Sequence, residues 1–199
     1  MFTKIENTQS FIHLYPVVCG LVFIQTFIFL LCMLHTDFFH TLLGHNEAIA
    51  RGDYWRIITP LFVHLSFHHF ISNLLTLILL GPFLEGYMRR VSFLLLYICS
   101  GLAGNIATFF LQPLSYVHAG SSGALFGIFG TYFYFFYTNK VHINSREKQL
   151  FLLLVGSNIF FSFTLENINT LSHLVGIVSG SLLTPFLLPK NYKSKLHFK

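Results

Sequence analysis

Residues 91–139 read VSFLLLYICSGLAGNIATFFLQPLSYVHAGSSGALFGIFGTYFYFFYTN, and none of these 49 residues is Asp, Glu, Lys or Arg. A membrane-spanning helix needs about 20 predominantly apolar residues. One uncharged run of this length therefore has room for two spans joined by a turn. The stretch predicts a helical membrane protein.

Four further uncharged runs flank this stretch, at 7–36, 57–84, 149–165 and 167–189. Each run has room for one span, so the chain should cross the membrane six times. We expect an all-α integral membrane protein, a bundle of six transmembrane helices. The expected spans are about 16–34, 67–84, 92–111, 122–138, 149–164 and 171–189.

The composition excludes a soluble domain. Charged residues make up 10% of the chain and hydrophobic residues 54%, whereas a soluble domain carries about 25% charged residues. All three cysteines lie in apolar runs, which favours buried thiols over disulfides. The basic residues behind the net charge of +5 lie in the expected loops and tails. The expected partner is therefore the lipid bilayer and not nucleic acid.

The basic residues orient the spans. Ten of the twelve Lys and Arg residues lie in segments on one side of the six spans, and the other side holds only Arg51 and Arg56. Lys and Arg collect on the cytoplasmic side. We therefore expect a multi-pass protein of the cell (cytoplasmic) membrane with both termini in the cytoplasm.

This orientation divides the chain into three parts. Residues 1–15 should be a cytoplasmic tail, residues 16–189 the six-span domain, and residues 190–199 a basic cytoplasmic tail. The external segment 35–66, between the first two spans, is long and rich in aromatic residues such as Tyr54 and Trp55. Because amphipathic rings settle at the membrane interface, this segment should be a membrane-associated loop.

Three polar clusters begin the second, fourth and sixth spans, at residues 64–73, 118–130 and 169–180. Polar groups inside hydrocarbon are expensive, and they suggest a functional site. The three spans run in the same direction, so their first residues share one depth. We expect the clusters to form one site near the outer surface.

Small residues suggest how two of these clusters meet. The patterns Gly123-xxx-Gly127 and Gly176-xxx-Gly180 are of the kind that lets helix backbones pack closely. Ser122 precedes the first pattern, and His173 stands three residues before the second. If these faces pack, the hydroxyl and the imidazole come within hydrogen-bond reach, which is the minimal arrangement for nucleophilic catalysis on an acyl group.

The motifs together resemble the rhomboid family of intramembrane serine proteases over residues 50–182. The motifs are Gly120–Ser121–Ser122–Gly123, His173 with Gly176 and Gly180, His64 with His69 and Asn73, and Trp55–Arg56. The resemblance implies an endopeptidase that cuts other membrane proteins in or near their transmembrane segments. Its active site would open to the outside, and no cofactor or metal is implied.

The resemblance also implies a role for each residue. Ser122 would be the nucleophile and His173 its general base, in a dyad without an acidic member. The Ser122 backbone N–H and the side chains of His69 and Asn73 would form the oxyanion hole. Phe126 would pack against the catalytic histidine, and the other supporting residues would be Gly120, Gly123, Gly176 and His64.

Other interpretations are weaker. A catalytically inactive rhomboid-like binder of membrane segments is the main alternative, but the chain retains both Ser122 and His173. His64 and His68 have the i, i+4 spacing of a zinc-binding helix, yet Leu65 stands where a zinc protease needs Glu. No role is assigned to His68 or His118. Ser121 lies beside Ser122, and the register of the Gly-x-Ser-Gly motif selects Ser122 as the nucleophile.

Overall fold

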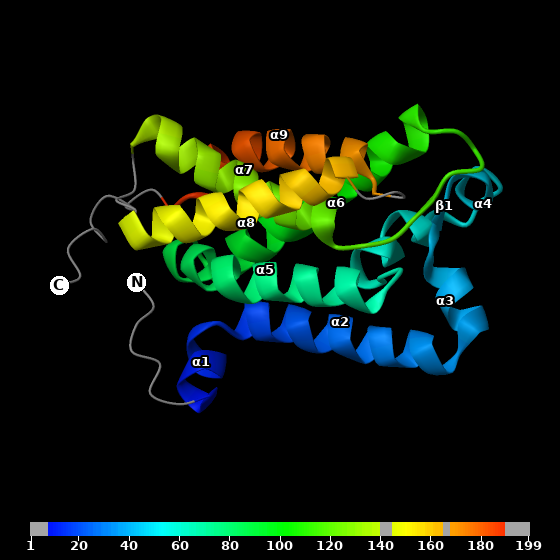
Figure 1. The fold of residues 1–199 in the computed structure, drawn as a ribbon, viewed down its shortest axis with the longest axis horizontal. Coiled ribbons are helices and arrows are strands. Elements are labelled where there is room, and N and C mark those ends of the chain that lie inside the picture. Colours follow the sequence, from blue (N-terminus) through cyan, green and yellow to red (C-terminus); the bar gives the residue numbers. More distant parts are fainter. Residues whose placement is uncertain (1–7, 140–144, 165–167, 190–199) are drawn as a thin grey trace.

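The computed structural model describes residues 8–139, 145–164 and 168–189, and they form an almost entirely helical bundle (Figure 1). Two of the long helices, α2 (Pro16–Leu34) and α7 (Ser122–Thr138), have the bounds expected from the sequence. The others begin or end up to four residues from the expected positions. These are α5 (Phe67–Tyr87), α6 (Arg90–Leu111), α8 (Ser145–Thr164) and α9 (Thr170–Leu187).

Four of these helices, α2, α5, α6 and α9, are long and apolar enough to cross a membrane. They indicate a multi-pass membrane protein. Helix α7 has 17 residues, and the apolar part of α8 is the shorter stretch Lys148–Phe160. The count of six spans therefore stays a prediction.

The segment between α2 and α5 is built of short elements. They are α3 (Thr36–Leu42), β1 (Gly44–His45), α4 (Asn46–Ala50) and the 3₁₀ helices η1 (Tyr54–Ile57) and η2 (Thr59–Phe62). Figure 1 shows α3, β1 and α4 gathered at one end of the bundle. The segment packs on the bundle as a small cap, and its position in the membrane remains a prediction.

Two polar side chains hold this cap in place. The Arg56 Nη1 atom donates to the carbonyl oxygens of His40 and Leu43, at 2.8 and 2.9 Å. The Asn46 Nδ2 atom donates to three carbonyl oxygens between residues 108 and 113, at 3.0–3.2 Å. The last four carbonyls of a helix lack partners within it, so Asn46 caps the C-terminal end of α6.

After α6 the chain turns back through residues 112–121 (Figure 1), where β2 (Val117–His118) pairs antiparallel with β1. A Cβ atom on Gly101 of α6 would lie 3.2 Å from the Cβ of Ala124. Gly101 lies ten residues before Leu111, the last residue of α6. At a rise of about 1.5 Å per residue, Ala124 lies about 15 Å below that end. Helix α7 therefore begins inside the bundle.

Glu85 of α5 fixes the N-terminal end of α2. Its carboxylate accepts hydrogen bonds from the backbone N–H groups of Val17 and Val18, at 2.9 and 2.8 Å. The first N–H groups of a helix have no partner within it and favour a negative charge. Glu85 thus caps α2 and ties it to α5. Ahead of it, Thr8–Leu14 form the short helix α1 within the expected N-terminal tail; the expected C-terminal tail, 190–199, lies outside the described residues.

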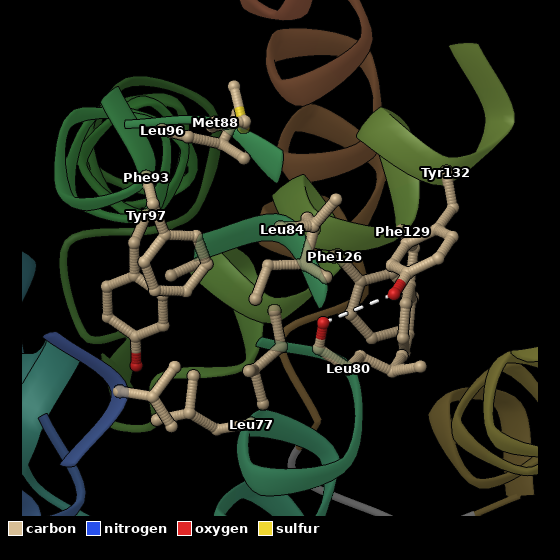
Figure 2. Close-up of a cluster of buried hydrophobic side chains, with 14 of the residues drawn as sticks. Leu77, Leu80, Leu84, Met88, Phe93, Leu96, Tyr97, Phe126, Phe129 and Tyr132 are labelled. Atoms are coloured by element: carbon tan, nitrogen blue, oxygen red, sulfur yellow. Dashed lines mark hydrogen bonds between the residues drawn. The ribbon is translucent and has the colours of Figure 1, made fainter. Parts of the chain in front are cut away.

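The apolar core lies among α5, α6 and α7, where Leu side chains pack against aromatic rings (Figure 2). The largest fully buried side chains include Tyr97, Phe93 and Phe129. Within this core the Tyr132 hydroxyl donates to the carbonyl oxygen of Leu80 at 3.2 Å, as the dashed line in Figure 2 marks.

Candidate active site

Helices α7 and α9 touch through their backbones. A Cβ atom on Gly180 would overlap the backbone of Gly127, and one on Gly176 would overlap the carbonyl oxygen of Gly123. Only glycine fits at such positions, because the neighbouring main chain cannot move aside as a flexible side chain can. The two glycine patterns of the sequence therefore face each other and bring the N-terminal ends of both helices together.

Ser122 and His173 meet at this junction. The Nε2 atom of His173 lies 2.8 Å from the Oγ atom of Ser122, within hydrogen-bond distance. The Phe126 ring stacks on the imidazole with centroids 4.0 Å apart and planes at 5°. His173 is buried and Ser122 is partly exposed. A hydroxyl bonded to an imidazole in this way can be activated as a nucleophile.

Asn169 fixes the first turn of α9. Its Oδ1 atom accepts from the Ser172 N–H at 3.1 Å, and its carbonyl oxygen accepts from the His173 N–H at 3.2 Å. Its Nδ2 atom donates to the Thr108 Oγ1 atom of α6 at 2.8 Å. Asn169 therefore anchors the helix end that presents His173. We assigned Asn169 no role from the sequence, although an Asn just before an apolar helix is a recognised N-cap signal.

Gly120 brings two further polar side chains close to Ser122. Its φ angle of 128° lies in the left-handed region that favours glycine. A Cβ atom there would lie 2.5 Å from the Cε1 atom of His69 and 3.7 Å from the Nδ2 atom of Asn73. Both side chains thus lie against the chain two residues before Ser122.

Asn73 is 2% exposed, and within the described part of the chain its Nδ2 atom has no hydrogen-bond partner. A buried donor without a partner costs about 1–3 kcal/mol. Such a cost is typical of a group held ready for charge that appears during a reaction.

The adjacent Ser121 has a different environment. It is 1% exposed, and its Oγ atom lies 3.4 Å from the Nε2 atom of His64. The His64 ring stands edge-on to His69, with centroids 5.3 Å apart. Burial, reinforced by His69, lowers the pKa of His64 to about 3, so His64 is neutral at pH 7. The structure thus separates two neighbouring serines, one paired with His173 and the other with His64.

The two histidines without an assigned role differ in burial. His118, in β2, is 5% exposed, and within the described residues neither ring nitrogen has a partner. Burial lowers the pKa of His118 to about 4. His68 is exposed on α5.

The structure does not support a zinc-binding helix that carries His64 and His68. His64 precedes Phe67, the first residue of α5, so His64 and His68 do not share a helix. Across the described ranges, no group of three or more His, Cys, Asp or Glu side chains is placed to hold a metal ion.

Comparisons with known proteins agree with these motifs. A family model described as the Rhomboid domain matches residues 51–190. The chain is 37% identical over 188 residues to the rhomboid relative YdcA of Bacillus subtilis (strain 168), covering 92% of this chain and 94% of YdcA. It is 34% identical over 154 residues to Rhomboid protease GluP of the same organism, covering 73% of this chain and 28% of GluP. RHOMBOID-like protein 1 of Arabidopsis thaliana is 29% identical over 139 residues, covering 69% of this chain and 36% of that protein.

Proposed function

This chain belongs to the rhomboid family, and from that premise we propose that it is an intramembrane serine endopeptidase with Ser122 as nucleophile and His173 as general base. The observation that carries the proposal is the 2.8 Å distance between the His173 Nε2 atom and the Ser122 Oγ atom. A related protease, GluP, is matched over 154 residues.

In the first step the neutral His173 accepts the Ser122 proton while the Ser122 oxygen attacks the carbonyl carbon of the scissile peptide bond. The imidazolium then gives this proton to the leaving amine, and an acyl enzyme remains. Water, deprotonated by the same imidazole, hydrolyses the ester and restores Ser122. The stacked Phe126 ring holds the imidazole plane through both proton transfers.

The oxyanion of the tetrahedral intermediate needs donors on the side of Ser122 that faces Gly120. The unpartnered Asn73 amide and the His69 ring lie on that side, and the Ser122 backbone N–H is the third donor. Loss of one such donor typically slows turnover about 100- to 1000-fold. Gly120, Gly123 and Gly176 allow the close approaches, and His64 holds the neighbouring Ser121.

The substrates would be transmembrane segments of other membrane proteins. A membrane helix hides its carbonyls in internal hydrogen bonds, so cleavage requires local unwinding, and segments with small or helix-breaking residues should be cut preferentially. Water reaches Ser122 from the outer side through the region covered by residues 112–121. Acyl transfer by a serine and a histidine needs neither a metal nor a cofactor.

The distribution of arginine residues supports the proposed orientation of the chain in the membrane. Arg89 precedes α6 and Arg90 begins it, at one end of the helices, and Arg51 and Arg56 lie in the cap at the other. With basic residues inside, the cap and the active site face the outside and both termini lie in the cytoplasm. A reporter fused after Lys199 should remain cytoplasmic in cells; a reporter on the outside would contradict this map.

The proposal is tested by cleavage of a model transmembrane substrate with purified protein in detergent. Ser122→Ala and His173→Ala should each abolish cleavage, while Asn73→Ala and His69→Ala should reduce turnover with the thermal unfolding midpoint close to that of the wild type. Undiminished cleavage by Ser122→Ala or His173→Ala would overturn the dyad. Binding of the substrate without cleavage by the wild type would instead favour an inactive binder of membrane segments.

A further inference from the structure

His173 lies in the first turn of its helix, where a helix is held least firmly. Helix α9 begins at Thr170, so His173 is its fourth residue, and the glycine contact with α7 lies at Gly176 and beyond. The first N–H groups of a helix have no partner within it, and helix ends fray. A fixed position for His173 therefore requires a second attachment at the start of α9.

Helix α6 supplies this attachment, although it carries no residue of the dyad. The end of α6 lies beside the start of α9 (Figure 1), where the Asn169 Nδ2 atom donates to the Thr108 Oγ1 atom at 2.8 Å. One turn earlier on α6, a Cβ atom on Gly104 would lie 3.0 Å from the carbonyl oxygen of Ser172. Residues four apart share one face of a helix. One face of α6 thus holds the first turn of α9 at two points.

The donors and acceptors of this attachment have a single assignment. The Thr108 hydroxyl donates to the Gly104 carbonyl oxygen at 2.8 Å, as a Thr inside a helix often does, so its oxygen is left to accept from Asn169. The Asn169 Oδ1 atom accepts from the Ser172 N–H at 3.1 Å. A reversed amide would set its NH₂ group against that N–H, which is also a donor. The Asn169 side chain therefore has one orientation, which links Thr108 to α9.

Thr108 is itself firmly placed. Its side chain is fully buried. Its carbonyl oxygen accepts from the Gln112 N–H at 3.0 Å and from the Nδ2 atom of Asn46, a residue of the cap, at 3.1 Å. Because the last turn of α6 is held in this way, Thr108 is a fixed point against which α9 can be positioned.

The attachment reaches His173 through one residue. The carbonyl oxygen of Asn169 accepts from the His173 N–H at 3.2 Å, so a shift of Asn169 moves the backbone of His173. The His173 Nε2 atom lies 2.8 Å from the Ser122 Oγ atom, and a hydrogen bond of that length is lost when it grows by about 1 Å. Small movements at the start of α9 are therefore enough to separate the dyad.

We propose that Thr108 is a positioning residue for the general base, and that it holds His173 in register with Ser122 through Asn169. Thr108 acts through Asn169 and not on the reacting atoms, so it is not a catalytic residue. Through it α6, and through Asn46 the cap, contribute to the rate of the reaction. This inference rests on the proposed function.

The test compares Thr108→Val, Asn169→Ser and the double variant in the full chain, in detergent. Val keeps the shape of Thr without the hydroxyl, and Ser at position 169 keeps an N-cap oxygen but is too short to reach Thr108. Misplacement of reacting groups by about 1 Å can cost 100-fold, and loss of one link should shift them less. Each single variant should lower kcat about tenfold and leave KM unchanged. The double variant should be no slower than the slower single variant, because both changes remove one link.

Two further measurements separate positioning from a general loss of stability. Thr108→Ser keeps the hydroxyl, so its kcat should stay within about twofold of wild type. The rate at which a fluorophosphonate labels Ser122 should fall in Thr108→Val by the same factor as kcat, because labelling depends on the dyad but needs no transmembrane substrate.

Thr184→Val is the matched control at the other end of α9. Thr184 is also fully buried, and its hydroxyl bonds the Gly180 carbonyl oxygen at 2.7 Å and lies 2.9 Å from the Thr131 Oγ1 atom of α7. This variant should lower the thermal unfolding midpoint about as much as Thr108→Val but keep the wild-type kcat.

The proposal is overturned if Thr108→Val or Asn169→Ser keeps the wild-type kcat, if the two single effects multiply in the double variant, or if Thr184→Val slows cleavage as much. If Thr108→Val does not fold, Asn169→Ser decides: a tenfold lower kcat supports the proposal and the wild-type kcat overturns it. A wild type that neither cleaves the substrate nor reacts with a fluorophosphonate contradicts the proposed function itself. An active wild type with unaffected variants contradicts only this inference.

Discussion

Two of the helices that pack against α7 attach to it in different ways. Helix α9 meets it backbone to backbone, and Gly180 has no room for a Cβ atom against Gly127. Helix α8 meets it through aromatic side chains: the Phe151 ring packs 4.9 Å from Tyr132 and 5.1 Å from Phe136, between ring centroids. On α8, a Cβ added to Gly156 would meet nothing within 4 Å.

The difference shows what each contact can control. Two backbones in contact leave no freedom for sliding, so they fix the distance between Ser122 and His173. Aromatic rings can slide and tilt over one another at small cost, so the Phe151 contact stabilises the bundle without setting the geometry of the dyad. We therefore expect changes at α9 to alter catalysis and changes at α8 to alter mainly stability.

The largest effect should come from Gly180→Ala. The new methyl group overlaps the Gly127 backbone, so the helices must separate and the dyad distance must grow. Cleavage of a model transmembrane substrate should fall at least about 100-fold. Gly156→Ala is the matched control; it should cleave within about twofold of wild type and gain roughly 0.5–1 kcal/mol in unfolding free energy from its helix propensity. Equal activity in the two variants would show that the α7–α9 backbone contact does not set the geometry of the dyad.

Phe126→Leu should have the next largest effect. It removes the ring that stacks on His173 and keeps the site apolar, so kcat should fall about tenfold while the dyad remains. Phe129→Leu, one turn further along and also buried, should cost similar stability with kcat within about twofold of wild type. The two kcat values, measured at saturating substrate, check the prediction; a similar loss in Phe129→Leu would refute a specific role for the stack.

Phe151→Ala should affect stability more than chemistry. Removing a fully buried Phe typically costs about 3–5 kcal/mol, and the thermal unfolding midpoint should fall accordingly. The rate at which a fluorophosphonate labels folded protein below that midpoint should stay within about threefold of wild type. A loss of labelling as large as that of Gly180→Ala would show that α8 also sets the dyad.

The smallest expected effect is a dependence of folding stability on pH. The pKa of His118 in the folded chain is lowered to about 4, against about 6.5 unfolded. Between these values the His118 imidazole is protonated in the unfolded chain but not in the folded chain. Its contribution to the free energy of unfolding is therefore fully present above pH 6.5 and is lost as the pH drops toward 4, by on the order of 1 kcal/mol per pH unit. The lowered pKa of His64 likewise reduces the free energy of unfolding as the pH falls. The unfolding midpoint of His118→Gln should therefore vary less between pH 6.5 and 4 than that of wild type; an unchanged pH profile would contradict this.

Parts of this structure follow from the sequence because they depend on local patterns. The gaps between charged residues show where α2 and α7 must lie, since an uncharged apolar run must form a helix in lipid. The glycine spacing likewise predicts the face on which α7 meets α9. The role of Asn169 as a helix cap was also readable, from its position before an apolar run.

Other parts depend on contacts between distant residues. Nothing near Gln25 or Tyr97 in the chain indicates that their side chains meet, 72 residues apart. The depth at which α7 begins depends on how residues 112–121 fold back and pair with β1, and two-residue strands leave no pattern in a sequence. The cap between α2 and α5 forms because Arg56 and Asn46 bond backbone carbonyls, which any sequence offers.

We propose Ser122, and not its neighbour Ser121, as the nucleophile paired with His173. The most direct measurement is mass spectrometry of the purified protein after reaction with a fluorophosphonate, which adds to an activated serine oxygen. The adduct should lie on Ser122 and be absent from His173→Ala. An adduct on Ser121, or equal labelling of Ser122 in His173→Ala, would contradict the dyad.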